Sequence, residues 1–147
     1  MRFERAITPK ITIGDQPTEA DLARLKAEGY TGIVNLRNDG EPEQPIDTIT
    51  EGAKVRDLGM EYHHLGVGGT PLSAPGVQGV CGFIAKQDKV MVHCRGGGRA
   101  AGLVLIQQAQ AQGWTPDEAV DNGRAIGLEV SGGLRAIVEG YLAANKS

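Results

Sequence analysis

One stretch constrains the fold more than any other: residues 89–106, which read KVMVHCRGGGRAAGLVLI. A short apolar run with β-branched residues leads into three consecutive glycines, and an apolar segment of helical length follows. This order predicts a strand, a tight loop and a helix. Cys94 opens the loop and Arg99 closes it, so both side chains are expected where the strand gives way to the helix.

The loop between Cys94 and Arg99 has the composition of an anion-binding site. Its glycines let several backbone N–H groups converge on one point, and the N-terminus of the following helix adds its positive end. A thiol placed there ionises more readily than an ordinary cysteine, and the planar guanidinium of Arg99 can grip two oxygens of one anion. We therefore expect Cys94 to be a nucleophile inside an anion-binding loop. The residues expected to form this loop are Arg95, Gly96, Gly97, Gly98 and Arg99.

Three other interpretations fit this loop less well. A buried and inert Cys94 does not explain the glycines and the arginine. Gly96, Gly98 and Ala101 match a loose dinucleotide-binding pattern, but that pattern needs a further strand ending in an acidic residue, whereas residues 114–118 begin another helix. The Gly-Lys-Ser/Thr ending of a P-loop is missing.

Composition narrows the classes of function. The 147 residues carry a formal net charge of −3, which offers no basic surface to nucleic acid. We expect neither a signal peptide nor a membrane span, because the first residues are charged and the longest apolar run, residues 100–106, is short. Two cysteines do not make a disulfide framework, so we expect a cytoplasmic protein with reduced thiols. The sequence also suggests no cofactor and no metal site.

Strands and helices are expected to alternate along the chain. Strands are indicated within residues 2–13, at 31–36, at 60–65 and before Cys94; helices are indicated at 18–29, 47–58, 75–86, from the glycine loop to 113, at 115–127 and from 131 onward. This alternation predicts a single α/β domain over residues 1–147, with a mainly parallel sheet flanked by helices. Ligands bind at the carboxyl ends of such strands. The loops 37–41, 65–70 and 94–99 should therefore meet at one crevice.

Two helices have an apolar stripe that predicts which side is buried. Cys81 lies on the stripe of the helix at 75–86, which favours core packing over a second reactive thiol. The last helix is expected to bury Leu134, Ile137, Val138 and Tyr141.

The motif His93-Cys94 followed by a glycine loop closing on Arg99 resembles the signature of the cysteine-dependent, dual-specificity-like protein phosphatases. Three segments together look more closely like the bacterial phosphatase-like domain found beside beta-lactamase-like hydrolases: Ile11-Thr-Ile-Gly-Asp-Gln-Pro17, Asn35-Leu-Arg-Asn-Asp-Gly-Glu41 and His93-Cys-Arg-Gly-Gly-Gly-Arg99. The resemblance implies a protein-tyrosine-phosphatase-like fold, with Cys94 as nucleophile and Arg99 as the residue that holds the anion. It also implies a role for His93 behind the thiol.

The chain departs from the phosphatase pattern at three places. Four residues separate Cys94 from Arg99, whereas phosphatases typically have five and rhodanese sulfurtransferases typically have four. Ala100 stands where a Ser or Thr usually follows the arginine. The general-acid Asp expected after the strand at 60–65 falls on Val67-Gly-Gly-Thr70. Asp39, Glu41 and His64 are the remaining candidates for an acid.

Three functions are compatible with these features. The first is hydrolysis of phosphate monoesters through a phosphocysteine on Cys94. The second is sulfur transfer through a persulfide on the same residue, which the loop length favours. The third is an inactive anion-binding module. The expected substrate is a small anion, either a phosphate ester or a sulfane-sulfur donor, and neither nucleic acid nor a membrane is expected as a partner.

Overall fold

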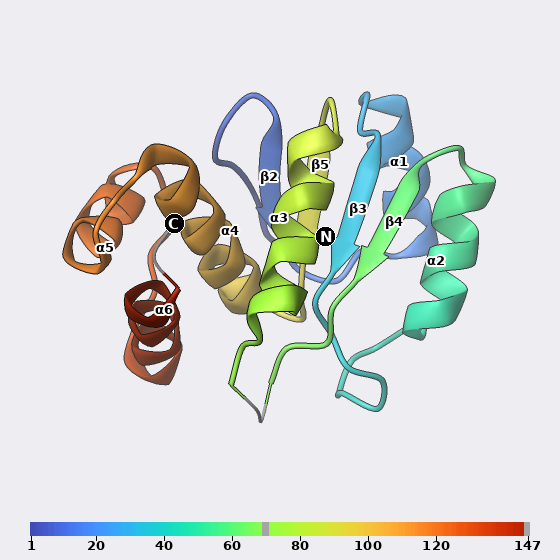
Figure 1. Ribbon diagram of the computed structural model, residues 1–147. Coiled ribbons are helices and arrows are strands. Elements are labelled where there is room, and N and C mark those ends of the chain that lie inside the picture. The colour runs from blue at the N-terminus through green and yellow to red at the C-terminus, as the bar shows by residue number, and fades with distance from the viewer. Residues whose placement is uncertain (69–70, 146–147) are drawn as a thin grey trace.

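The computed structural model describes residues 1–68 and 71–145, and it contains a five-stranded sheet with helices on both faces (Figure 1). The strands are β1 (Glu4–Ala6), β2 (Ile11–Gly14), β3 (Gly32–Asn35), β4 (Glu61–His64) and β5 (Val90–His93). The helices are α1 (Glu19–Ala27), α2 (Thr48–Asp57), α3 (Ala74–Lys86), α4 (Gly98–Gln112), α5 (Pro116–Ala125) and α6 (Gly132–Ala144).

The sheet is mainly parallel, as the alternation of elements predicts. Its order is β1-β2-β5-β3-β4, and only the edge pair β1–β2 is antiparallel. β5 occupies the centre between β2 and β3, which explains why all four of its residues, Val90–His93, are buried. The expected α/β class is therefore confirmed, and the strand that leads to Cys94 is a fully buried central strand of the sheet.

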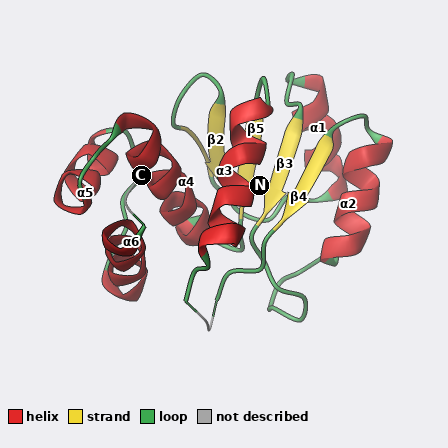
Figure 2. Cartoon of the chain, viewed as in Figure 1, coloured by secondary structure: helices red, strands yellow, loops and turns green. Residues whose placement is uncertain are grey.

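Two apolar clusters lie on opposite faces of the sheet, because successive strand residues point to opposite sides. On one face, Val34 and Val92 pack against α3 and α4. On the other, Ile33 and Met91 pack against α1 and α2. Figure 2 shows these helices on either side of the strands, with α5 and α6 placed beyond α4.

Local signals at the helix ends behave as the sequence indicates. Thr18 and Thr115 each form a capping box with the residue three positions on, Asp21 and Glu118. Asp47 caps α2 through the N–H of Thr50. Within the described residues, no helix is long and apolar enough to cross a membrane.

α6 is where the expected burial is partly wrong. Val138 and Tyr141 are buried, and Leu134 packs against the core from a partly exposed position, but the side chain of Ile137 is 42% exposed. The reason is that α6 packs on α4 and α5 rather than on the sheet, so its apolar stripe is wider than the surface that covers it. Cys81, by contrast, packs against the core as expected, and burial raises the pKa of its thiol.

The close approach of α6 to α4 depends on Gly102. A Cβ on this residue would lie 3.1 Å from Leu134 Cδ1 and 3.4 Å from Val138 Cγ2. We expect Gly102→Leu to lower the free energy of unfolding by about 1–3 kcal/mol through overpacking. Gly82 on α3, where an added Cβ meets nothing within 4 Å, is the matched control. Urea denaturation should show no loss for Gly82→Leu, and an equal loss in both variants would contradict this account of the α4–α6 contact.

Candidate active site

Cys94 lies directly after β5, at the carboxyl end of the central strand. Its side chain is 1% exposed, and its Sγ accepts a hydrogen bond from the backbone N–H of Gly97 at 3.1 Å. Gly97 adopts a φ of +101°, which a residue with a side chain rarely adopts. A Cβ at this position would also lie 2.6 Å from the ring of Phe3. Glycine is therefore needed here to turn the N–H toward the sulfur.

The N-terminus of α4 supplies further N–H groups beside Cys94. The N-cap residue, Gly97, makes no side-chain capping bond, and the first backbone bond of the helix runs from Ala101 N to Gly97 O at 2.9 Å. The N–H groups of Gly98, Arg99 and Ala100 come before that bond and have no helical acceptor. Together with the positive end of the helix, they favour both a thiolate and a bound anion.

Arg99 is held in place by Glu41 through two parallel hydrogen bonds. Nη1 donates to Oε2 at 2.8 Å and Nη2 donates to Oε1 at 2.7 Å. Nη1 also donates to the carbonyl of Val67 at 2.8 Å and lies 3.4 Å from that of Leu36. The Glu41 bonds and the nearby Cys94 raise the pKa of Arg99, so its charge is permanent. In the described part of the chain, the edge formed by Nε and the second Nη2 hydrogen has no oxygen acceptor, and this edge suits two oxygens of an anion.

Glu41 also binds a second guanidinium, that of the fully buried Arg37. Arg37 Nε donates to Glu41 Oε1 at 3.2 Å, and its Nη atoms donate to Gln16 Oε1 and to the carbonyls of Pro42 and Glu43. The hydrogen bond from Arg99, above all, lowers the pKa of Glu41 to about 2. A carboxylate that is ionised throughout the neutral range has no proton to donate, so its contacts favour a role in positioning Arg99 over the role of a general acid.

The other two acid candidates make contacts that organise the same loop. Asp39 accepts from the Thr48 backbone N–H at 2.9 Å and from the Thr48 hydroxyl at 3.0 Å. His64 Nε2 lies 2.6 Å from the carbonyl oxygen of Arg37, to which it donates. These contacts place both side chains in structural roles at the start of α2 and the end of β4. The segment where the phosphatase resemblance would place an acid, Val67-Gly-Gly-Thr70, includes Gly69 and Thr70, which lie outside the described residues.

His93 lies behind Cys94 and is bound on both ring nitrogens. Nε2 is 2.6 Å from Glu51 Oε2, with both side chains fully buried, and Nδ1 is 3.3 Å from the carbonyl oxygen of Cys94. Gln16 extends these hydrogen bonds toward Arg37, because it donates to Glu51 Oε1 and accepts from Arg37 Nη1. A continuous hydrogen-bonded network, buried at Arg37, Glu51 and His93 and half-buried at Gln16, thus links the histidine behind Cys94 to the carboxylate that holds Arg99.

Glu51 and Gln16 are the participants that sequence reasoning missed. A signal for Glu51 does exist: Thr48, Gly52 and Val55 lie on the buried side of α2, and Glu51 shares that side. A carboxylate at such a position needs a buried partner. Gln16 gives no comparable signal.

The three loops expected to share one crevice do meet. Arg99 from the glycine loop contacts Glu41 of the second loop and the Val67 carbonyl of the third. Arg95 points elsewhere: its exposed side chain pairs with the exposed Glu43 at 2.9 Å. Arg95 therefore contributes to the candidate site only through its backbone.

Residues 3–111 match the family described as beta-lactamase hydrolase-like protein, phosphatase-like domain. A beta-lactamase hydrolase-like protein of Agrobacterium fabrum (strain C58) is 30% identical over 131 residues, which cover 88% of this chain and 30% of that protein. The chain thus spans about 30% of the length of the curated relatives it matches.

Solved structures share the fold at low sequence identity. PTPMT1 in complex with PI(5)P has a TM-score of 0.78 at 17% identity, covering 96% of this chain and 95% of that one. The core catalytic domain of the PP-IP phosphatase SIW14 from S. cerevisiae has a TM-score of 0.66 at 14% identity, covering 95% and 83%. The family match and the curated relatives show that the chain belongs to the family of phosphatase-like domains of the beta-lactamase hydrolase-like proteins. These matches do not favour a sulfurtransferase or an inactive module.

The ion pair between Glu41 and Arg99 predicts a specific dependence of stability on pH. The pKa of Glu41 is about 2 in the folded protein, against an ordinary value of 4.5. The ion pair therefore makes its full contribution to the free energy of unfolding above about pH 4.5, and this contribution is lost as the pH falls toward 2. We expect Glu41→Gln to lower the free energy of unfolding by on the order of 1–2 kcal/mol at pH 7, since water partly screens the pair. The difference from wild type should shrink below pH 4.5 in urea titrations. Glu129→Gln, at an exposed position, is the control, and a difference independent of pH would contradict the assignment.

Arg99→Lys tests the geometry of the anion site. Lysine cannot make two parallel hydrogen bonds, and losing one charge-assisted bond costs about 1.5–3 kcal/mol. We expect vanadate or sulfate to bind roughly 10- to 150-fold more weakly, measured by titration calorimetry. Arg95→Lys is the matched control because its side chain points to Glu43, and it should leave the affinity unchanged. Equal affinities in Arg99→Lys and wild type would mean that the guanidinium does not touch the anion.

Proposed function

We propose that this domain hydrolyses phosphate monoesters through a phosphocysteine on Cys94. The observation that carries the proposal is the arrangement around the thiol: the Gly97 N–H points at Sγ, and the open edge of Arg99 lies at the same helix N-terminus. Such a site holds a tetrahedral dianion and a nucleophile in contact. Membership of the phosphatase-like family supports the same chemistry.

The reaction has two steps. In the first, backbone N–H groups of residues 95–99 and the Arg99 edge bind the phosphoryl oxygens, and the Cys94 thiolate attacks phosphorus. The S–P bond forms, the P–O bond breaks, and the leaving oxygen departs with the electron pair. In the second, water attacks phosphorus, the S–P bond breaks, inorganic phosphate forms and the thiolate returns. Donors fixed before the reaction stabilise the developing charge in both steps.

Glu41 and the pair His93–Glu51 act as positioning groups in this proposal. Glu41 fixes the plane of the Arg99 guanidinium. His93 binds the carbonyl of Cys94 and thereby fixes the backbone that aims the thiol. The proposal includes a small anionic substrate, action of residues 1–147 as one domain, and a cytoplasmic setting in which the thiol stays reduced.

Sulfur transfer is the second candidate, because four residues separate Cys94 from Arg99. A loop of this length offers fewer N–H groups than one of five residues, which suits a single terminal sulfur. The Cys94 thiolate would attack the outer sulfur of thiosulfate, the S–S bond of thiosulfate would break, sulfite would leave with the electron pair, and a persulfide would remain on Cys94. The family match is the reason to rank this reaction second.

A pair of parallel assays distinguishes the two reactions. We expect release of nitrophenolate from p-nitrophenyl phosphate and no formation of sulfite from thiosulfate. Acid quenching during turnover should trap a phosphoryl group on the peptide that contains Cys94, as seen by mass spectrometry. Cys94→Ser should abolish both signals, while Cys81→Ser, which alters the thiol that α3 packs against the core, should keep them. Sulfite release with a persulfide on Cys94, and no phosphate turnover, would replace the proposal by the second candidate.

A further inference from the structure

An apolar cavity begins at the Arg99 side chain. Its volume is about 290 Å³, and Arg99 lines it together with aliphatic side chains from α4, α6 and the segment after β4. The principal aliphatic members are Val67, Leu72, Leu103, Leu134, Ile137 and Val138. Leu134 approaches the glycine loop itself, since its Cδ2 lies 3.9 Å from the position of a Cβ on Gly98. The anion-binding loop therefore has an apolar wall on one side.

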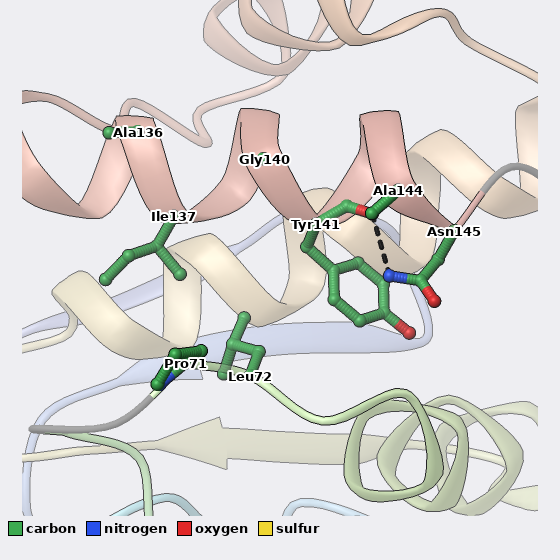
Figure 3. A pocket seen from close by; sticks show the side chains of 8 residues that line it. All are labelled: Pro71, Leu72, Ala136, Ile137, Gly140, Tyr141, Ala144 and Asn145. Atoms are coloured by element: carbon green, nitrogen blue, oxygen red, sulfur yellow. Dashed lines mark hydrogen bonds between the residues drawn. The ribbon is translucent and has the colours of Figure 1, made fainter.

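A second cavity, of about 640 Å³, continues this one along α6. The two share Leu72 and Ile137, and Figure 3 shows Ile137 and Tyr141 on α6 facing Pro71 and Leu72 across the groove. We name the two together the α6 groove. Its size lies in the range of sites that hold small ligands. Of the described residues that line it, only Arg99 carries a charge.

The chemistry of the α6 groove points to a flexible aliphatic occupant joined to an anion. The walls near Arg99 are Leu, Ile and Val side chains, which suit an alkyl chain. A peptide backbone would bring N–H and C=O groups that this lining leaves largely unsatisfied. The exposed Ile137 lies where such a chain would cover it.

The candidate site also restricts the leaving group. Residues 65–75 contain no Asp, Glu or His, Glu41 is ionised by its pairing with Arg99, and Asp39 and His64 are bound elsewhere in the loop. Protonation of a leaving group is ordinarily worth ~10²–10⁴-fold. An alkoxide needs that proton, whereas a carboxylate, being a weak base, departs without one.

We propose that the substrate class of this domain is an acyl phosphate with an alkyl tail, the phosphoryl group lying in the Cys94 loop and the tail in the α6 groove. The inference rests on the proposed phosphocysteine chemistry. The Cys94 thiolate forms the S–P bond, the bond between phosphorus and the acyl oxygen breaks, and the fatty carboxylate leaves with the electron pair and no proton. Water then releases inorganic phosphate from Cys94.

Turnover of a series of substrates tests both the acyl leaving group and the position of the alkyl tail. We expect kcat/KM to rise about fourfold for each buried methylene from acetyl to butanoyl to hexanoyl phosphate. Ethyl, butyl and hexyl phosphate should react at least ~10²-fold more slowly than the acyl compound of equal length. Cys94→Ser gives the spontaneous hydrolysis to subtract. If alkyl phosphates are turned over as fast as acyl phosphates, the proposal of a carboxylate leaving group is wrong. If kcat/KM is the same for all acyl phosphates of the series, the proposal that the alkyl tail lies in the α6 groove is wrong.

A pair of isoleucine variants locates the effect in the groove. Ile137→Ser should lower the ratio of hexanoyl to acetyl turnover about tenfold. Ile126→Ser is the matched control, because Ile126 is 36% exposed, close to the 42% of Ile137, and lies outside the groove. An equal fall in both variants, or faster turnover of benzoyl than of hexanoyl phosphate, would contradict an alkyl occupant. A dimer of the wild type that Ile137→Ser dissociates in sedimentation would assign the groove to a second copy instead.

A binding measurement separates this inference from the proposed function. We expect hexylphosphonate to bind at least ~100-fold more tightly than methylphosphonate in calorimetry, with Ile137→Ser removing much of the difference. If p-nitrophenyl phosphate is not hydrolysed but this difference is present, the phosphatase proposal fails and the groove stands as an alkyl site. If phosphate esters are hydrolysed and the two phosphonates bind equally, the groove inference fails alone.

Discussion

The site depends on one carboxylate, Glu41, that binds two guanidinium groups at once. Arg37 is fully buried, and a buried cation without a partner is strongly destabilising. Glu41 supplies that partner through Oε1 and uses both of its carboxylate oxygens to hold Arg99 across the crevice. Removing Glu41 would therefore disturb the loop after β3 and the anion site together. The orientation of Arg99 is set before any ligand arrives, so little conformational entropy remains to be lost on binding.

The site depends secondly on a hydrogen-bonded network that runs from Arg37 through Gln16 and Glu51 to His93. It connects the two strands β3 and β5, whose carboxyl ends carry Arg37 and Cys94. Fully satisfied polar networks of this kind make a buried region rigid. The nucleophile and the anion-holding arginine thus share one frame, although they belong to opposite ends of the glycine loop.

Sequence reasoning succeeded where the information is local. A few adjacent residues determine each of these features: the capping boxes at Thr18 and Thr115, and the glycine loop after β5. It was less informative where a partner lies far along the chain. Glu41 and Arg99 are 58 residues apart, so no sequence feature near Glu41 distinguishes a carboxylate that pairs with an arginine from a general acid. Ile137 was misplaced for a related reason. Periodicity shows that α6 has an apolar stripe, but only the packing on α4 shows how much of that stripe is covered.

The same packing explains how one fold combines an anion site with an apolar surface. Gly98 and Gly102, one turn apart on α4, let Leu134 and Val138 of α6 approach the helix that carries Arg99. Larger residues at these positions would move α6 outward and open the wall beside the loop. The width of the groove is in this way set by the absence of side chains on these two glycines.

The charge distribution has a consequence for how a ligand reaches the site. Arg37, Glu41 and Arg99 together carry one net positive charge at the crevice, whereas the whole chain carries −3. An approaching dianion is repelled at long range by the net charge of the whole chain and attracted by these three groups only over the last few ångströms. At physiological ionic strength the Debye length is about 8 Å, so salt screens the distant repulsion more than the attraction within the partly buried crevice. Association should therefore be slowed less by added salt than in enzymes whose entire surface attracts their substrate, and the cell's own ionic strength favours encounter.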